Sequence, residues 1–336
     1  MTDRTGRPLR AAVIGLGMMG RNHVRVWDDD VAGVELVAVA DPSESALRQA
    51  THRRRAHAYR DASVMLAEES PELVSVAAPT TLHLPLVLAA LDAGAHVLVE
   101  KPIAASRDEA EAMMRAAVDA GRILSVGHIE RFNPAIRELR RRLGTGELGR
   151  VFQLHATRLG PFPARIRDVG VVVDLAPHDI DVMRFLLNSE AVRVYGETEQ
   201  RIHTEHEDLF VGTVKFENGA LGLLDINWLT PTKVRRLRVI GEAGMYSADY
   251  LTQELLFYPE TGDVPLGEGV AVSRGVERRE PLVVELEAFA AAVRDGGPPP
   301  VDPREAMVAL LLARAMVESA NRGLAIAGAE LRGMVA

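Results

Sequence analysis

The sequence contains no cysteine, and this absence removes several kinds of chemistry from consideration. Without thiols the chain can form no disulfide, no thiolate nucleophile and no cysteine-ligated zinc site. Residues 1–10 are polar and lack the apolar core of a secretory signal, and no later run approaches the roughly 20 apolar residues of a membrane span. Together these absences predict a cytoplasmic protein.

Lysine is scarce as well. Only three of the 39 basic residues are lysines, namely Lys101, Lys215 and Lys233. The chain has no basic run with interleaved aromatic residues, and its net charge is −8, so neither a nucleic-acid nor a membrane partner is expected. Because arginine supplies nearly every positive charge, a position that keeps lysine is a candidate for chemistry that arginine does not imitate.

The length of 336 residues exceeds the roughly 250 residues that one core usually reaches, so two domains are expected. Up to residue 128, short apolar runs alternate with amphipathic stretches, which is typical of a doubly wound α/β domain with a parallel sheet. The expected strands are 11–14, 35–40, 73–77, 96–99 and 123–126. The expected helices are 19–28, 44–54, 62–69, 84–93 and 107–120.

The pattern changes after residue 128, where the second domain (129–336) is expected to begin. Strand-like runs at 151–157, 210–216, 220–227 and 234–240, separated by turn signals, predict an antiparallel sheet. Helices are expected at 134–142, 173–187, 283–293 and 303–321. The second domain is therefore also of the α/β class.

A glycine-rich loop, GLGMMG at residues 15–20, follows the first expected strand and begins a helix. In this context Gly15 allows a tight turn, Gly17 lets the backbone approach a pyrophosphate, and Gly20 allows close helix–strand packing. Asp41 follows the second strand, where its carboxylate would accept hydrogen bonds from ribose hydroxyls and repel a 2′-phosphate. The loop and Asp41 predict NAD as the cofactor, with NADP as the less favoured alternative.

Lys101 lies between Glu100 and Pro102 directly after the strand expected at 96–99. Open α/β sheets bind ligands at this edge. An ammonium group there can donate a hydrogen bond to a substrate hydroxyl and stabilise a developing alkoxide. The alternative interpretation is an ordinary surface lysine.

Asp174 and His178 are four residues apart, so a helix at 173–187 would place both on one face. Pro177 is tolerated if the helix begins shortly before it. Histidine is suited to removing a proton from an alcohol near neutral pH, and a carboxylate beside it can stabilise the charged ring. The pair predicts a general base with a supporting acid, and the alternative is a capping acid beside an ordinary histidine.

The glycine loop, the segment from Pro79 to His83, Glu100-Lys101-Pro102 and the Asp174/His178 pair together resemble the glucose-fructose oxidoreductase/inositol dehydrogenase/MocA (Gfo/Idh/MocA) family over essentially the whole chain. The resemblance implies a Rossmann domain, a C-terminal α/β domain with a large open, mostly antiparallel sheet, and a homodimer or homotetramer. It implies that Lys101 positions the substrate hydroxyl, His178 is the base and Asp174 supports it. The implied cofactor-binding residues are Gly15, Gly17, Met18, Met19, Gly20, Asp41, Pro79, His83 and Glu100.

Segments 127–134, 158–171 and 174–184 further resemble nucleotide-sugar dehydrogenases that act on UDP-N-acetylglucosamine. Guanidinium groups in the Gly/Pro-rich segment could bind a diphosphate. The expected substrate-binding residues are Arg131, Asn133, Arg158, Arg165 and Arg167. The chain departs from the family at residues 175–177, where many members have a glycine just before the base. The predicted reaction is NAD-dependent oxidation of a sugar 3-hydroxyl to a 3-keto sugar.

Two other functions stay open. A dehydrogenase of a free sugar or an inositol would use the same catalytic residues, and a non-catalytic sugar- or NAD-sensing regulator could keep the fold without the chemistry. No metal is expected, because His203 and His206 with Glu205 and Glu207 resemble a polar hairpin edge more than a ligand set.

Overall fold

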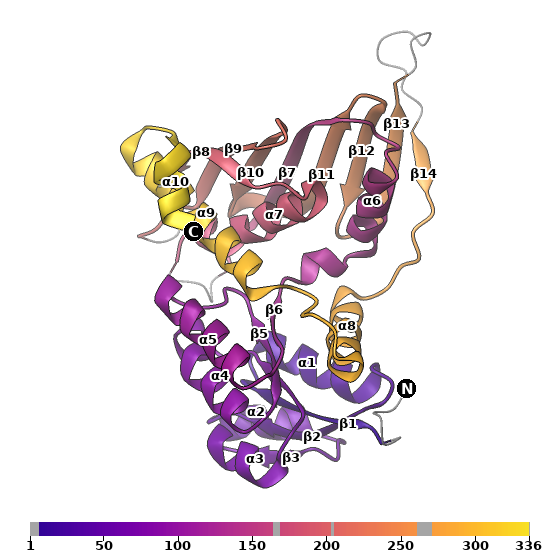
Figure 1. The fold of residues 1–336 in the computed structure, drawn as a ribbon, viewed down its shortest axis with the longest axis vertical. Helices are drawn as coiled ribbons and strands as arrows, with labels where there is room; N and C mark the ends of the chain where they lie inside the picture. Colours follow the sequence, from indigo (N-terminus) through magenta and orange to yellow (C-terminus); the bar gives the residue numbers. More distant parts are fainter. Residues whose placement is uncertain (1–6, 164–168, 203–204, 261–270, 336) are drawn as a thin grey trace. The chain divides into compact units, whose positions relative to one another are not determined.

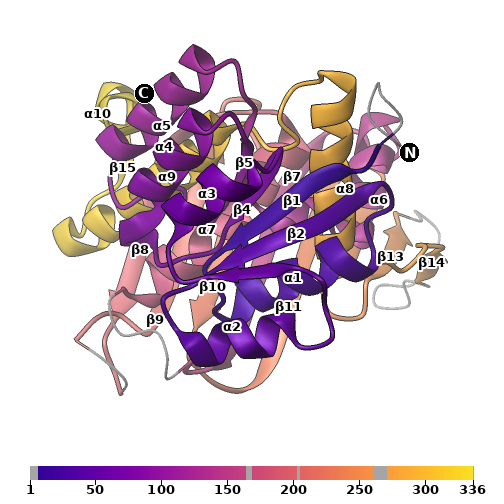
Figure 2. The ribbon, with the colours of Figure 1, turned by 90° about the horizontal axis from the view of Figure 1, so that it is seen from below.

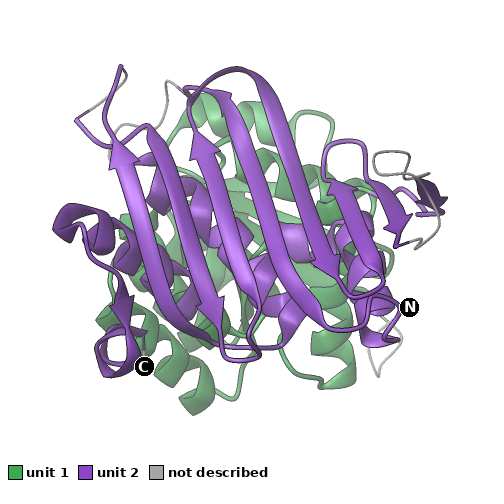
Figure 3. Cartoon of the chain, turned by 90° about the horizontal axis from the view of Figure 1, so that it is seen from above, with its two compact units in different colours: residues 1–129, 280–307 green, residues 130–279, 308–336 purple. Residues whose placement is uncertain are grey.

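The computed structural model describes residues 7–163, 169–202, 205–260 and 271–335. The chain divides into two compact units: unit 1 comprises residues 1–129 and 280–307, and unit 2 comprises residues 130–279 and 308–336 (Figure 3). The first boundary lies one residue from the predicted break after residue 128. The return of residues 280–307 to unit 1 differs from the predicted assignment of these residues to the second domain.

Unit 1 is a doubly wound α/β domain, as predicted (Figure 2). Its six strands pair in parallel in the order β3-β2-β1-β4-β5-β6. They are β1 (Leu9–Ile14), β2 (Val34–Ala40), β3 (His57–Tyr59), β4 (Leu73–Val76), β5 (His96–Glu100) and β6 (Leu124–Gly127). From β1 the sheet continues outward through β2 and β3, and from β4 it continues in the opposite direction through β5 and β6. The loops after β1 and β4 therefore lie at the switch point where such sheets bind ligands.

Helices cover the parallel sheet of unit 1. They are α1 (Met18–Asp29), α2 (Glu44–Thr51), α3 (Ala62–Glu69), η1 (Thr80–Leu82), α4 (His83–Asp92), α5 (Arg107–Asp119) and α8 (Pro281–Asp295). The Ser106 hydroxyl accepts a hydrogen bond from the Glu109 N–H and so caps the start of α5. Since β1 and β4 are buried almost throughout, their side chains pack on both faces of the sheet.

Unit 2 is built on a nine-stranded sheet in the order β14-β13-β12-β11-β7-β10-β9-β8-β15 (Figure 3). Its strands are β7 (Val151–Pro161), β8 (Ala191–Glu199), β9 (Leu209–Phe216), β10 (Leu221–Asn227), β11 (Leu229–Gly241), β12 (Gly244–Asp249), β13 (Glu254–Pro259), β14 (Val272–Arg274) and β15 (Ile326–Ala327). Among the described strands of this sheet, every pairing is antiparallel except that of β7 with β10, so the sheet is mostly antiparallel, as predicted.

One face of this sheet is covered by helices, and the alternating burial of β9 and β10 shows which side chains face them (Figure 1). The helices of unit 2 are α6 (Pro134–Gly144), α7 (Val171–Leu187), the greater part of α9 (Pro303–Arg322) and α10 (Gly328–Val335), and η2 (Ile129–Phe132) spans the boundary of the units. Within the described ranges, no helix is both long and apolar enough to cross a membrane.

Candidate active site

The loop after β1 has the backbone geometry that a dinucleotide phosphate requires. Gly15 has a φ of +88°, in the region that favours glycine, and a Cβ there would lie 2.7 Å from the Ala78 nitrogen. A Cβ on Gly20 would lie 1.8 Å from the Gly15 carbonyl oxygen, so only glycine lets α1 approach the loop this closely. Gly17 is the N-cap residue of α1 and provides no side-chain cap, and no atom lies within 4 Å of where its Cβ would be. The uncapped first turn of α1 therefore suits a pyrophosphate.

Asp41 completes the cofactor side of unit 1. Its Oδ2 accepts a hydrogen bond from the Leu16 N–H at 2.7 Å, and its Oδ1 accepts one from the Ser43 N–H at 2.8 Å. The carboxylate is thus fixed at the end of β2 beside the glycine loop, where Met18 is exposed and Met19 is partly buried. This arrangement fits an NAD-type dinucleotide, with the carboxylate suited to ribose hydroxyls.

The segment after β4 carries Pro79 and His83. Pro79 precedes η1, and His83 is buried with Nε2 at 2.9 Å from the Ala78 carbonyl oxygen and Nδ1 at 3.1 Å from that of Ile103. Both ring nitrogens are therefore directed at backbone carbonyls, and His83 joins the loop after β4 to the segment that follows Lys101. These contacts support a role of His83 in shaping the loop, and the expectation that Pro79 and His83 bind the cofactor stays a prediction.

Glu100 and Lys101 lie at the carboxyl end of β5, as the sequence predicts, and the Lys101–Pro102 peptide is cis. Glu100 is buried, and both of its oxygens have partners inside unit 1. Its Oε1 lies 2.9 Å from His23 Nε2, and its Oε2 accepts a hydrogen bond from the Lys101 N–H at 3.2 Å. Burial acts to raise the pKa of Glu100, but the hydrogen bond and charge of His23 outweigh it, so the pKa is lowered.

Ser75 extends this buried network. Its hydroxyl lies 3.1 Å from His23 Nδ1 and accepts a hydrogen bond from Trp27 Nε1 at 2.8 Å. Both ring nitrogens of His23 therefore have a polar partner, Ser75 on one side and Glu100 on the other. Glu100 is therefore held from one side by His23 and contacts the backbone of Lys101 on the other, and its predicted contact with the cofactor stays a prediction.

Helix α7 carries Asp174 and His178 on one face, four residues apart, as predicted. Both side chains are partly exposed, whereas Leu175 and Ala176 between them are buried. Pro177 lies inside α7, which continues through it to Leu187. The departure from the family pattern at residues 175–177 thus leaves the helical spacing of the acid and the base intact.

The start of α7 is held by Glu207, which sequence analysis did not assign to this helix. Its backbone oxygen accepts a hydrogen bond from the Val171 N–H at 2.9 Å, and its Oε1 accepts one from the Val172 N–H at 3.2 Å. A Cβ on Gly170 would lie 2.0 Å from the Glu207 carboxyl carbon, so glycine leaves the room for this cap. The sequence carries no local signal for the contact, because the two segments are 35 residues apart.

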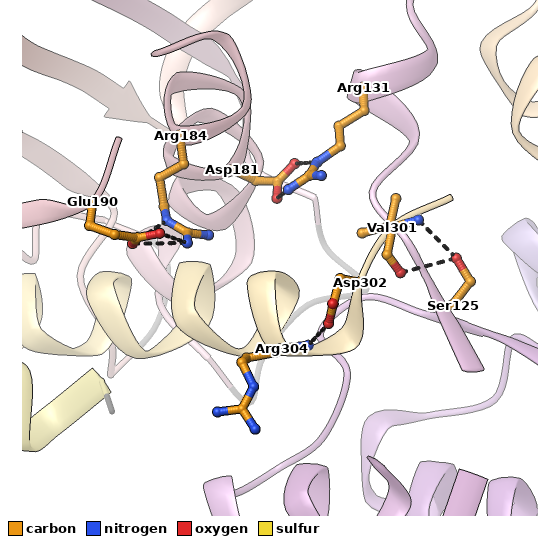
Figure 4. Close-up of polar contacts among 8 residues, drawn as sticks. All are labelled: Ser125, Arg131, Asp181, Arg184, Glu190, Val301, Asp302 and Arg304. Carbon is orange, nitrogen blue, oxygen red and sulfur yellow. Dashed lines mark hydrogen bonds and ion pairs between the residues drawn. The ribbon is translucent and has the colours of Figure 1, made fainter. Parts of the chain in front are cut away.

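Two of the predicted substrate-binding residues have partners within unit 2. Arg131 is buried and donates from Nε and Nη2 to the two oxygens of Asp181, at 2.7 and 2.6 Å (Figure 4). Asn133 caps α6 through the Ala135 N–H and donates from Nδ2 to the Tyr250 carbonyl oxygen. Arg131 thus pairs with α7, and Asn133 joins the start of α6 to Tyr250, while their predicted contact with substrate stays a prediction.

Arg158, the third of these residues, is also buried and occupied by carboxylates. Its Nε and Nη2 donate to Asp179 at 2.7 and 3.0 Å, and its Nη1 donates to Glu130 at 3.0 Å. The pKa of Arg158 is raised, because these two carboxylates outweigh the effect of burial. Arg158 thus joins β7 to α7 and η2 and has its donors directed at carboxylates, while its predicted diphosphate contact stays a prediction.

A different cation, Arg235 of β11, lies next to this network and was missed in the sequence. It is opposite Arg158 in the β11–β7 register, and its Nη1 donates to the carbonyl oxygens of Leu159 and Val234. Burial lowers the pKa of Arg235 to about 10, and the charge of Arg158 adds to this effect. The strand pattern could have revealed it, because Arg235 shares the face of the buried Leu237 and Val239.

Arg165 and Arg167 lie outside the described residues. His203, which was expected in a polar hairpin edge, also lies outside them, and Glu207 of the same predicted group caps α7. Over the parts of the chain with a described structure, no group of three or more His, Asp or Glu side chains could hold a metal ion.

Comparisons with known proteins agree with this architecture. Residues 9–128 match an oxidoreductase family with an NAD-binding Rossmann fold, and residues 136–247 match the Gfo/Idh/MocA C-terminal domain. The chain is 30% identical to the UDP-N-acetylglucosamine 3-dehydrogenase of Acidithiobacillus ferrooxidans over 93% of this chain and 98% of the relative. It is 27% identical to the scyllo-inositol 2-dehydrogenase (NAD(+)) of Bacillus subtilis, over 95% and 96%.

A solved structure of the UDP-N-acetylglucosamine 3-dehydrogenase from Acidithiobacillus ferrooxidans is similar to this fold throughout, with a TM-score of 0.85 at 28% identity. The similarity covers 94% of this chain and 98% of that chain. The family matches span both units, and the relatives are named as dehydrogenases of sugars or polyols. The chain therefore belongs to the Gfo/Idh/MocA family and is an NAD-binding sugar or polyol oxidoreductase.

Proposed function

We propose that this protein oxidises the 3-hydroxyl of a nucleotide sugar, such as UDP-N-acetylglucosamine, to a 3-keto sugar. The observation that carries the proposal is the 30% identity, over 93% of the chain, with a UDP-N-acetylglucosamine 3-dehydrogenase. Support comes from three residues that the family resemblance identifies as reacting groups. Lys101 follows β5, and Asp174 and His178 share one partly exposed face of α7.

Each of these residues has one task in the proposed reaction. His178 removes the proton of the 3-hydroxyl, because imidazole is basic near neutral pH. Asp174, one turn earlier on α7, stabilises the imidazolium that forms. Lys101 donates a hydrogen bond to the same oxygen and stabilises its developing negative charge. Bound NAD supplies the acceptor for the hydride that leaves the carbon, so the CH–OH group loses one proton and one hydride.

NAD is the proposed cofactor in preference to NADP. The Asp41 carboxylate is held at the end of β2 by the N–H groups of Leu16 and Ser43. Bringing a 2′-phosphate to this position would place two negative charges together, whereas ribose hydroxyls can donate to the carboxylate. The expected result is a lower KM for NAD than for NADP, and Asp41→Ala is expected to narrow this difference.

A second candidate is oxidation of an inositol or a free sugar. It is favoured by the inositol dehydrogenases among the relatives, which are similar over nearly the full chain at 27% identity. The same three catalytic residues would serve this reaction, so they do not separate the two candidates. The third alternative is a non-catalytic regulator. These relatives are named as dehydrogenases, so they favour an enzyme over a regulator.

The proposal is tested by following NADH formation with UDP-N-acetylglucosamine, inositols and free sugars, using the wild type and His178→Ala. Turnover that requires the UDP-sugar and is lost in the variant is the expected result. Turnover of an inositol but of no nucleotide sugar would reject the proposed substrate and keep the second candidate.

A further inference from the structure

Several buried arginines of unit 2 pair with carboxylates through the same edge of the guanidinium group. In each case Nε and Nη2 donate to one carboxylate, which is the bidentate geometry that a planar oxyanion prefers. Figure 4 shows two of the pairs, those of Arg131 and Arg184. The three pairs are Arg131 with Asp181, Arg158 with Asp179, and Arg184 with Glu190.

Arg235 does not follow this rule, although it lies on the same face of the sheet opposite Arg158. It uses Nη1 for the carbonyl oxygens of Leu159 and Val234. In the described portion of the chain, no carboxylate forms an ion pair with Arg235, and its Nε and Nη2 have no hydrogen-bond acceptor. The bidentate edge of Arg235 is therefore fixed in direction by two backbone contacts but is not used by the protein.

Burial makes this arrangement unusual. The guanidinium group is partly buried, and its lowered pKa reflects lost hydration beside the positive charge of Arg158. A partly buried cation normally has a paired carboxylate, because desolvation is costly. Asp179 and Glu130 act on Arg235 from a distance, but they form their hydrogen bonds with Arg158. An anion that reaches Arg235 would thus meet a partly desolvated donor without displacing a protein partner.

The neighbours of Arg235 place this edge near Gly160 and within the electrostatic reach of Asp174. A Cβ on Gly160 would lie 3.7 Å from Arg235 Nη2, so the guanidinium lies over the backbone near the end of β7. Asp174 is close enough for its charge to act on Arg235. The free edge is therefore in the part of unit 2 that carries the first turn of α7.

We propose that Arg235 binds an oxyanion of the substrate through Nε and Nη2. This inference rests on the proposed function and makes it more specific, because the diphosphate of a nucleotide sugar supplies such an oxyanion whereas an inositol has none. A sugar carboxylate, as in a uronic acid, presents the same planar pair of oxygens. Arg235 thereby selects charged sugars over neutral polyols.

The test measures binding of UDP and of glucuronate to the NAD-loaded full-length protein by calorimetry. The variants are Arg235→Gln, Arg235→Lys and the control Arg236→Gln. Arg236 is the next residue of β11, lies on the other face, is exposed and pairs with Asp249. Loss of a charge-assisted bidentate contact is expected to weaken UDP binding about ten- to a hundredfold in Arg235→Gln. Arg235→Lys restores part of the affinity, and Arg236→Gln binds UDP as the wild type does.

Thermal unfolding of each variant confirms that it is folded. Equal UDP affinity in Arg235→Gln and wild type would overturn the proposal, as would a wild type that oxidises a polyol and binds neither anion. Binding of glucuronate but not UDP, lost in Arg235→Gln, supports the oxyanion site and identifies a carboxylate as its ligand. If UDP binds through Arg235 but no UDP-sugar is oxidised, the proposed function fails while this inference holds.

Discussion

Arg158 shows how a single side chain can stabilise the helix that carries the proposed base. Replacing it with leucine leaves the Asp179 carboxylate buried without its cation, and removes a donor from Glu130. The free energy of unfolding is expected to fall by about 3–5 kcal/mol, which is typical for breaking a buried pair. Urea unfolding measures the change, with Arg193→Leu on an exposed position of β8 as the control. A loss below 1 kcal/mol would mean that the pair is dispensable.

Glu100 makes unit 1 sensitive to acid. Its pKa is lowered by folding from the usual value of 4.5, so its stabilising contribution is complete above pH 4.5 and is lost as the pH falls through the lower folded value. Glu100→Gln is expected to reduce the free energy of unfolding at pH 7 by about 1–3 kcal/mol. This difference from wild type should shrink below pH 4.5. Measuring the free energy of unfolding at a series of pH values tests this expectation, with Glu44→Gln at an exposed position as the control. A difference between wild type and Glu100→Gln that does not change with pH would contradict it.

At the scale of one element, the start of α7 depends on Glu207. Glu207→Ala removes the side-chain acceptor of the Val172 N–H, and loss of a helix cap costs about 0.5–2 kcal/mol. Because Asp174 lies in this first turn, kcat is expected to fall with little change in the KM for NAD. Glu205→Ala, an exposed neighbour, is the control.

Gly170→Ala gives an independent check of the same cap. Its added methyl group would meet the Glu207 carboxylate at about 2 Å, so the variant is expected to be destabilised. The destabilisation should be smaller when Glu207 is already alanine, since the obstacle is then gone. Additive effects of the two substitutions would show that the cap does not act through this contact.

The sequence predicted the elements that carry the candidate site but not the pairing of its charged residues. The period of four between Asp174 and His178, and the position of Lys101 after an apolar strand, are local signals, and the structure contains the helix and the strand that they indicate. Pairing between distant charges leaves no such signal. For that reason Arg158 was expected to meet a substrate, and Arg235 was not singled out.

For the whole molecule, the order of strands and helices predicted the α/β class and both kinds of sheet. It did not predict where α8 packs. An amphipathic pattern shows that a helix has an apolar face, but it does not show which sheet this face covers. In the structure Leu282, Leu286 and Phe289 of α8 belong to the core of unit 1. A homodimer or homotetramer remains a prediction, which sedimentation analysis tests.

The packing of α8 leads to the prediction that residues 1–129 are an incomplete domain. Ser125 of β6 exchanges hydrogen bonds with the Val301 backbone at 3.3 Å, so the segment after α8 also belongs to unit 1 (Figure 4). Losing one buried phenylalanine typically costs about 3–5 kcal/mol, and residues 1–129 alone lose Phe289 together with two leucines. This loss is comparable with the whole stability of a domain.

Two proteins test this prediction: residues 1–129 alone, and the same residues joined through a flexible glycine–serine linker to residues 280–307. Only the second is expected to unfold cooperatively on heating and to bind NAD. Phe289→Ala in the joined protein is the control for specific packing, and it should lower the melting temperature. The prediction would be wrong if residues 1–129 alone unfolded cooperatively and bound NAD as tightly as the joined protein. The glycine loop and Asp41 would then keep their geometry without α8.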